Sequence, residues 1–245
     1  MGLSCWKDFA AVGPISHHQM RYLLLLTISA ATAIAQPVSF GIKAGVPLSD
    51  LVNATSVFAG PGGFSNDTSM TSPYIVGPTV EARLPLGLAI EVDALYRHLN
   101  YTSTFDTCIL CGSLAGSSGM TKATAGDWEF PLVVKYRFFR AKRVRPYVDM
   151  GVAGEILTNL AQTGLTQSFD FSGVSPPMNA AASAPRELNK RAVIGFVTGA
   201  GVDVHLPFLH LSPEIRYTRW GAQQFVSLGL SSNKNQVDFL LGITF

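Results

Sequence analysis

Apolar and polar residues alternate along the final segment of this chain. In 237–245, the odd positions are Val, Phe, Leu, Ile and Phe, whereas Asp238, Gly242 and Thr244 fall between them. Successive side chains of a β-strand point to opposite faces, so a period of two predicts a strand with one apolar and one polar face. We therefore predict that the chain ends in a strand whose apolar face includes Phe245.

Seven earlier segments show the same alternation, some strongly and some weakly. In 127–138, large apolar residues occupy the even positions, and Asp127, Glu129, Lys135 and Arg137 occupy odd ones. The predicted strands are 38–46, 74–84, 88–97, 127–138, 146–156, 192–206, 209–217 and 237–245. A soluble antiparallel sheet with one buried face would alternate in the same way, so the pattern alone leaves that class open.

The connections between these strands alternate between short and long. Short turns are predicted at 85–86, 140–143 and 207–208, and long connections at about 48–73, 99–125, 157–190 and 221–236, all rich in Gly, Ser, Thr, Asn and Pro. This order is typical of an up-and-down barrel with both termini at one end. Within the third long connection, the low-complexity segment 178–185 is expected to be mobile or disordered.

Composition decides between a membrane protein and a soluble one. Only 14% of the residues are charged, 47% are hydrophobic and the mean hydropathy is +0.26. Beyond the N-terminus no run approaches the roughly 20 apolar residues of a spanning helix, which leaves a closed barrel as the membrane-crossing structure. We predict an all-β fold, an eight-stranded antiparallel up-and-down transmembrane β-barrel. The net charge of +2 is spread along the chain, so we expect no nucleic-acid partner.

The start of the chain has the pattern of a secretory signal. An uncharged apolar stretch follows Met20-Arg21, and small residues stand at Ala33 and Ala35. We predict a signal peptide at 20–35, with residues 1–19 an upstream extension or mis-assigned start, and a single barrel domain at 36–245. The alternative is an uncleaved anchor helix, which the proline and the alternating pattern that follow disfavour.

Aromatic residues are expected to form two girdles, because Trp and Tyr gather where the apolar belt meets lipid headgroups. The predicted outer girdle is Tyr74, Trp128, Tyr217 and Trp220, and the predicted inner girdle is Phe40, Phe138, Phe139, Phe208 and Phe245. A soluble β-sandwich would not group its aromatic residues by membrane level.

With these features the chain resembles the small eight-stranded outer-membrane barrels of the OmpA-like type, over nearly all of its mature length. The resemblance rests on the signal ending at Ala35, the strand count, the alternation of connections and the final strand. It implies a Gram-negative outer-membrane location with both termini periplasmic, a monomer, and lipid and lipopolysaccharide as partners. It also implies that periplasmic chaperones and the barrel-assembly machinery recognise the terminal strand through Phe239, Leu241, Ile243 and Phe245. Full-length OmpA carries a peptidoglycan-binding domain after its barrel, and a cell-wall tether is not expected here.

The polar faces of the predicted strands supply a set of lumen charges. They are Lys43, Glu81, Arg83, Glu91, Asp93, Arg97, Glu129, Lys135, Arg137, Asp149, Glu155, Asp203, Glu214 and Arg216. The signs are mixed, and an eight-stranded barrel is just wide enough for its side chains to fill. We therefore expect a core of salt bridges and hydrogen bonds; the alternative is an open pore.

The most specific short motif in the sequence is the pair of cysteines Cys108 and Cys111, which are separated by two residues. Cys5 lies before the predicted cleavage site, so these two would be the only cysteines of the mature protein, and a disulfide is expected in an oxidising exterior. A thioredoxin-like redox role needs an α/β fold, and zinc needs two further ligands where only His98 is near. We expect no cofactor and no metal.

A second short motif, His210-Leu211-Ser212, has the spacing of the His-x-Ser pair of lipid A deacylases. Gln224 stands where that pattern needs an acid, and the strand phase turns both polar residues toward the lumen, so a lumen network is favoured and no enzyme activity is expected. Basic residues near the outer strand ends, Lys190, Arg191, Arg219 and Lys234, are candidates for lipopolysaccharide phosphates or for a solvated rim.

Three functions follow from this sequence. The favoured one is a structural or surface-interaction protein, a barrel with a filled polar lumen that acts through four extracellular loops. The second is a narrow channel or transporter for small or hydrophobic solutes, similar to the OmpW type. The third is a lipid A-modifying enzyme.

Overall fold

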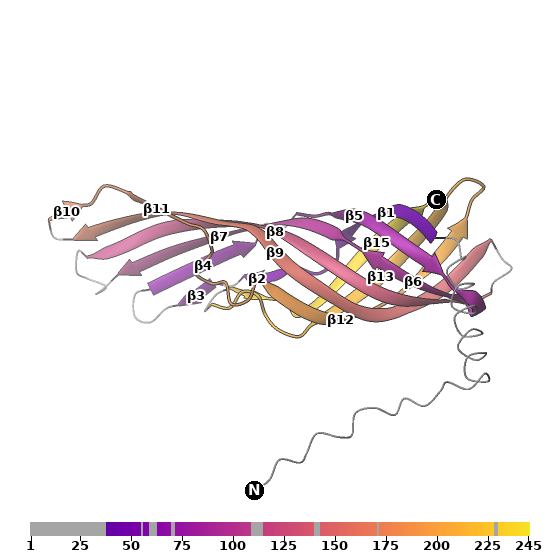
Figure 1. The fold of residues 1–245 in the computed structure, drawn as a ribbon. Helices are drawn as coiled ribbons and strands as arrows, with labels where there is room; N and C mark the ends of the chain where they lie inside the picture. The colour runs from indigo at the N-terminus through magenta and orange to yellow at the C-terminus, as the bar shows by residue number, and fades with distance from the viewer. Residues whose placement is uncertain are drawn as a thin grey trace, which may run out of the picture. The chain divides into compact units, whose positions relative to one another are not determined.

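Nearly all regular secondary structure in the computed structural model is β-strand (Figure 1). The structure describes residues 38–54, 56–58, 63–69, 72–108, 115–139, 143–170, 172–227 and 230–245. Within these ranges no helix has the length and hydropathy needed to cross a membrane. The predicted signal peptide, the upstream extension and Cys111 lie outside the described residues.

Eight strands close into a ring. They are β1 (Val38–Pro47), β5 (Ile75–Arg83), β6 (Leu88–Asp93) continued by β7 (Leu95–Cys108), β8 (Gly116–Arg137), β9 (Val144–Asp170), β12 (Ala192–His205), β13 (His210–Trp220) and β15 (Asn235–Thr244). Each pairs antiparallel with the next, and β15 pairs with β1. The predicted fold class, an eight-stranded antiparallel up-and-down barrel, is confirmed.

Ala94 separates β6 from β7 without ending the strand. Its amide donates to Pro78 O at 3.0 Å, and β5 pairs with residues on both sides of it. Gly77 faces this point, where an added Cβ would lie 1.8 Å from Ala94 O. The close approach of the two backbones therefore requires glycine at position 77.

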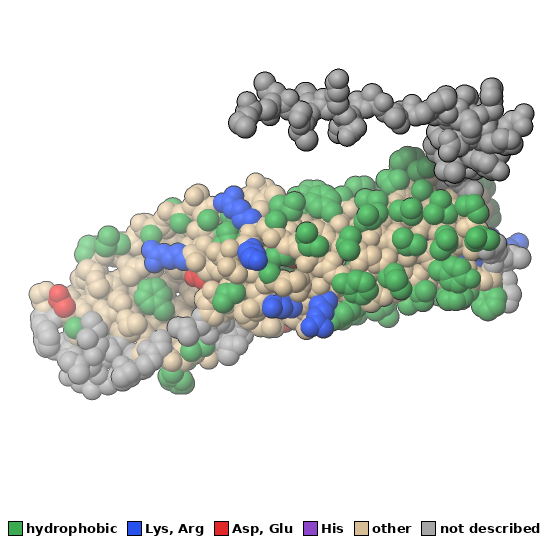
Figure 2. Space-filling model, turned by 60° about the horizontal axis from the view of Figure 1, so that its bottom comes forward, with side chains coloured by type: hydrophobic (Ala, Val, Ile, Leu, Met, Phe, Trp, Pro, Cys, Tyr) green, Lys and Arg blue, Asp and Glu red, His purple; other side chains and the backbone are tan. Residues whose placement is uncertain are grey.

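The two faces of the wall differ as the alternation predicts. Phe130 and Leu132 are 43% and 47% exposed on the outside, whereas Glu129 and Lys135 on the inside are 3% and 1% exposed. Figure 2 shows hydrophobic side chains covering the barrel surface as a belt. Contact with hydrocarbon requires an apolar exterior, whereas the interior of a spanning barrel is shielded from lipid and can be charged.

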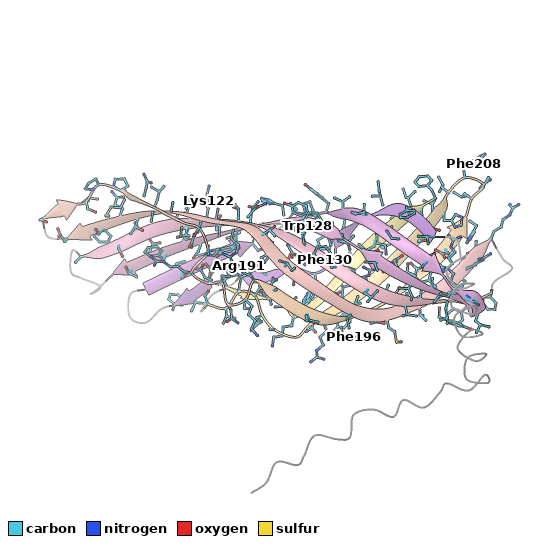
Figure 3. All side chains as sticks on the ribbon, in the orientation of Figure 1. Lys122, Trp128, Phe130, Arg191, Phe196 and Phe208 are labelled. Carbon is cyan, nitrogen blue, oxygen red and sulfur yellow. The ribbon has the colours of Figure 1, made fainter. Side chains whose placement is uncertain are left out.

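The short connections lie at the barrel end that carries Val38 and Phe245, here called the terminal end. The turn between β5 and β6 is the 3-10 helix η1 (Pro85–Gly87), and the Phe245 amide donates to Phe40 O at 3.0 Å. Phe208 projects from the β12–β13 turn and is 90% exposed (Figure 3). The opposite end is called the far end.

At the far end the prediction that 99–125 and 157–190 are irregular connections is wrong for most of their length. β7, β8 and β9 continue well past the barrel (Figure 1). They are joined there by β3 (Ser56–Phe58), β4 (Gly63–Ser69), β10 (Gly173–Val174) and β11 (Met178–Ala182). We call these four strands, with residues 98–108, 116–124 and 160–170, the sheet extension.

The alternation of apolar and polar residues is absent from the extension for a physical reason. Strands that stand in water on both faces need no apolar side, so the period of two disappears, although Thr-rich stretches still favour strand. The segment 178–185, expected to lack order, pairs with β9 through Met178–Ala182. Low complexity did not prevent pairing, because ladder hydrogen bonds use backbone groups that every residue except proline supplies.

One aromatic residue was placed on the wrong face. Trp220 is only 3% exposed and packs inside the barrel with Val193 and Val197, so it is not part of an outer girdle. It shares strand β13 and sequence parity with the buried Arg216, and alternation therefore turns both side chains inward. Tyr74, by contrast, is 53% exposed.

Candidate functional site

The inward faces of the strands bring the predicted lumen charges together. All of them are buried except Arg83, whose side chain is 28% exposed at the terminal end. Every strand of the ring except β15 contributes to this predicted set, because each presents alternate residues to the same narrow interior. Along the barrel the charges form three successive clusters.

The first cluster lies at the terminal end and is centred on Arg137. Its guanidinium bridges Glu81 and Asp203, and Arg83 Nε lies 3.1 Å from Glu81 Oε1. Ser212 Oγ donates a hydrogen bond to Asp203. A chain of charge-assisted contacts thus links β5, β8, β12 and β13 across the lumen.

The two polar residues of the His-x-Ser motif have different partners in this cluster. Ser212 is bonded to Asp203, whereas His210 Nδ1 lies 3.0 Å from Arg83 Nη2. The His210 ring also lies against His205, with centroids 4.0 Å apart and the ring planes tilted by 53°. The observed contacts are those of a polar network at the barrel mouth.

The second cluster fills the middle of the lumen. Lys43 Nζ lies 2.5 Å from Glu91 Oε1 and 3.2 Å from Glu214 Oε2, and Lys135 Nζ lies 2.6 Å from Glu91 Oε2. Arg216 binds Glu214 at 2.7 Å and Asp93 at 2.9 Å. Three cations and three carboxylates therefore form one continuous buried network, in which each ion has more than one partner.

The third cluster surrounds Arg97. Its guanidinium contacts Asp127 at 2.5 Å, Glu155 at 3.1 Å and the Gln236 side-chain oxygen at 3.0 Å. Asp127 and Asp238 are 1% and 2% exposed, yet the predicted network did not include them. Both residues could have been predicted as lumen charges, because they occupy inward positions of the alternating pattern.

Carboxylates outnumber cations inside the described barrel. Its ten buried carboxylates are Glu81, Glu91, Asp93, Asp127, Glu129, Asp149, Glu155, Asp203, Glu214 and Asp238, and its five buried cations are Lys43, Arg97, Lys135, Arg137 and Arg216. Both oxygens of Asp149 lack a hydrogen-bond partner among the described residues. The third cluster carries much of this excess, with unpartnered oxygens on Asp127, Glu129 and Asp238.

Beyond the third cluster, buried apolar residues close the far end. Strand β7 supplies Leu99 and Tyr101, and the connections supply Phe225 and the short paired strands β2 (Val52–Ala54) and β14 (Leu230–Ser232). We call this group the far-end plug; its buried members are Leu51, Val52, Leu99, Tyr101, Ala123, Ala125, Leu157, Phe225 and Leu230. Sequence reasoning missed the plug because half of it comes from connections with no strand periodicity.

Basic side chains gather where the apolar belt ends and the sheet extension begins. Lys122 and Arg191, labelled in Figure 3, are exposed there, and Figure 2 shows further Lys and Arg side chains beside the belt. The exposed members, here called the basic band, are Lys122, Lys190, Arg191, Arg219 and Lys234. Three of them are tied to the wall by backbone contacts: Lys122 is opposite Thr163, Arg191 O accepts from Leu157 N, and Lys234 O accepts from Trp220 N.

Two further predictions concern metal and disulfide sites. Cys108 ends β7, and the predicted bond to Cys111 involves a residue outside the described part of the chain. Within the described ranges, no group of three or more His, Cys, Asp or Glu residues has the arrangement of a metal site.

A closed ring of eight strands with a lipid-compatible exterior and a charged interior defines a transmembrane β-barrel. The chain belongs to the family of the outer membrane protein beta-barrel domain, whose model matches residues 34–221. It is an outer-membrane β-barrel protein.

Similar solved structures include other outer-membrane barrels. Neisserial surface protein A is 14% identical over 84% of this chain and 95% of its own, with a TM-score of 0.36. OprG from Pseudomonas aeruginosa is 14% identical over 84% and 91%, with a TM-score of 0.40. Ail of Yersinia pestis, crystallised with the heparin analogue sucrose octasulfate, is 10% identical over 85% and 99%, with a TM-score of 0.29. No curated protein matches the chain.

Proposed function

We propose that this protein is a sealed outer-membrane barrel with a structural and surface-interaction role. Its barrel anchors the sheet extension outside the cell, and its basic band contacts the phosphates of lipopolysaccharide. The filled lumen is the observation that carries this proposal.

Two features of the lumen support a sealed barrel. Arg216 on β13 reaches Asp93 on the opposite side of the ring, and Lys43 and Lys135 bind Glu91 and Glu214 in the same network, so a permeating solute would have to break several buried ion pairs at once. The far-end plug then adds a layer of apolar side chains that offers no hydrogen bond to water.

The orientation follows from the connections. Barrels of this kind have short periplasmic turns and longer extracellular segments. The terminal end carries the three short turns, so we assign it, with both termini, to the periplasm. The far end, with the extension and the basic band, then faces the exterior.

The basic band matches the chemistry of the outer leaflet. Lys122 and Arg191 lie where the apolar belt ends, which is the level of lipid phosphates in a bilayer. No acidic residue belongs to the exposed band, whereas Glu187 nearby is bound to Tyr101. The exposed Asp50 lies beside Lys234, because its backbone oxygen accepts a hydrogen bond from the Asn233 side chain, so the approach of anionic headgroups is governed mainly by the five cations of the band.

Planar-bilayer recording tests the sealed barrel. The purified protein is expected to give no steady conductance steps. A variant with Phe225→Ala and Leu230→Ala should also stay closed, because the ion-pair clusters still fill the lumen, whereas adding Arg216→Ala to it is expected to give at least brief steps. Steady steps from the unaltered protein would refute sealing and favour the narrow channel.

Thermal unfolding in the presence of lipopolysaccharide tests the basic band. The melting temperature of the unaltered protein is expected to rise with added lipopolysaccharide, because a ligand that binds only the folded state stabilises it. A variant with Lys122→Gln and Arg191→Gln should lose most of this rise. The matched control is Arg143→Gln, an exposed charge at the terminal end, which should keep it.

A further inference from the structure

A cavity of about 340 Å³ opens near the outer end of the sheet extension, away from the barrel lumen. Five strands meet there, and their contributions include Phe58, Phe64, Phe169, Asp106 and the hydroxyl pair Thr107 and Ser117. We call it the tip pocket. Its size is that of a site for a small molecule.

Three aromatic rings stand around the tip pocket, of which Phe58 is the most exposed. Phe58 and Phe64 lie directly opposite each other on β3 and β4, with ring centroids 5.6 Å apart and an edge-to-face angle of 63°. Phe169 on β9 lies over Gly116, where an added Cβ would come within 2.6 Å of the ring. The glycine thus leaves room for the aromatic ring against the backbone of β8.

Asp106 supplies a carboxylate beside these rings. It is paired in register with Phe64 and with Ser118, so it projects from the same face as the Phe64 ring. Its side chain is exposed, and among the described residues it has no ion pair or side-chain hydrogen bond. The carboxylate is therefore available to a ligand.

The surrounding charge reinforces this arrangement. The outer part of the extension, within segments 51–80, 98–121 and 157–185, contains Asp67, Asp106 and Asp170 but no Lys or Arg, and Lys122 stands nearer the barrel. The basic residues lie instead in the basic band, closer to the barrel (Figure 2). The tip pocket thus presents negative charge without a cation of its own.

We propose that the tip pocket binds a small organic cation, an ammonium group carrying alkyl substituents. The faces of aromatic rings carry negative quadrupole charge and attract cations, while alkyl groups bury against the same rings. The Asp106 carboxylate supplies the matching full charge on the face of the sheet that carries the Phe64 ring. Charge complementarity selects this ligand over a neutral apolar one.

Titration calorimetry with choline and its uncharged carbon isostere, 3,3-dimethylbutan-1-ol, tests the proposal. Choline is expected to bind roughly tenfold more tightly than the isostere, since only choline gains cation–π and ion-pair energy. Asp106→Asn should weaken choline binding roughly fivefold and leave the isostere unchanged. Phe169→Leu, which keeps apolar volume but removes a ring, should weaken choline roughly threefold.

Asp170→Asn is the matched control. It removes the same charge from the same extension, outside the residues lining the tip pocket, and should leave choline binding unchanged. Equal affinity for choline and the isostere, or choline affinity unaffected by Asp106→Asn, would overturn the proposal; so would binding of methyl glucoside in place of choline. Each variant is checked by the migration difference between unboiled and boiled protein, and the comparison of the two probes on unaltered protein stands even if a variant misfolds.

The inference extends the proposed surface role, but the binding measurement requires only folded protein. A conducting barrel that still binds choline would refute sealing alone. A sealed barrel that fails to distinguish choline from its isostere would refute the tip pocket alone.

Discussion

Tyr101 on β7 donates a hydrogen bond of 2.7 Å to Glu187 Oε2, which joins the barrel wall to the segment between β11 and β12. The same ring packs edge-on against Phe225, with centroids 5.7 Å apart. Burial, and then the hydrogen bond to Glu187, raises the pKa of the Tyr101 hydroxyl, so it remains a neutral donor at neutral pH. One side chain therefore holds two of the connections that form the far-end plug.

Tyr101→Phe should destabilise the plug without disrupting the barrel. The ring contact with Phe225 remains, whereas the Glu187 carboxylate loses its donor, at a cost of about 1–3 kcal/mol. Limited proteolysis of the connections at 183–191 and 221–227 is expected to become faster, while the melting temperature of the barrel changes little. Tyr217→Phe, which removes an exposed hydrogen bond to Asn235, is the matched control and should leave the cleavage rate unchanged.

Arg97→Met and Asp149→Asn should have different effects on the free energy of unfolding. Removing Arg97 leaves Asp127 and Glu155 without their buried cation, which should cost about 3–5 kcal/mol. Neither carboxylate oxygen of Asp149 has a hydrogen-bond partner among the described residues, so replacing this charge by a neutral amide should be neutral or stabilising. Urea unfolding in detergent measures both; equal destabilisation by the two substitutions would contradict the paired core.

Gly77→Ala should prevent β5 from pairing closely with β6 and β7 around Ala94. The new Cβ would lie 1.8 Å from Ala94 O, a backbone atom that cannot move without displacing β6 and β7. Gly154→Ala is the control, because its Cβ would meet nothing within 4 Å. Electrophoresis of unboiled protein should show a folded band for Gly154→Ala and little or none for Gly77→Ala, and equal folding yields would refute the tight approach.

Cys108 and Cys111 are expected to form a disulfide in the mature protein. Intact-mass measurement of protein from the outer membrane, alkylated without reduction, should show no added label and an N-terminus at Gln36. After reduction, two labels are expected, because Cys5 is removed with the signal peptide. Labelling without reduction would contradict the disulfide, and a start before Gln36 would contradict the predicted cleavage.

Much of the barrel could be predicted from sequence, because lipid imposes a simple local rule. A strand that separates hydrocarbon from a narrow lumen must alternate, and Lys135 and Phe130 reveal their faces through that alternation alone. Trp220 was predicted to lie in the outer girdle because of its residue type, although its position in the alternating pattern turns its side chain inward. Asp127 and Asp238 were likewise visible as inward positions and were left out of the predicted network.

The extension and the plug follow no such rule. Residues 102–108 and 116–122, beyond the plug, pair as strands in water, where neither face must be apolar, so no period marks them. Phe225 and Leu51 are far apart in sequence and meet only because the closed wall brings their connections over one opening. Tip-pocket residues such as Phe58 and Phe169 come together for the same reason.

The sequence by itself determined the eight strands, the two faces of each and the charges that point inward, since these depend on the local contrast between lipid and lumen. Tertiary structure alone decided which charges pair, as Lys43 with Glu214, because partners distant in sequence are chosen by register and closure of the ring. It also decided that the far end is plugged and that the wall continues as a sheet extension, because contacts between connections leave no periodic mark on the chain.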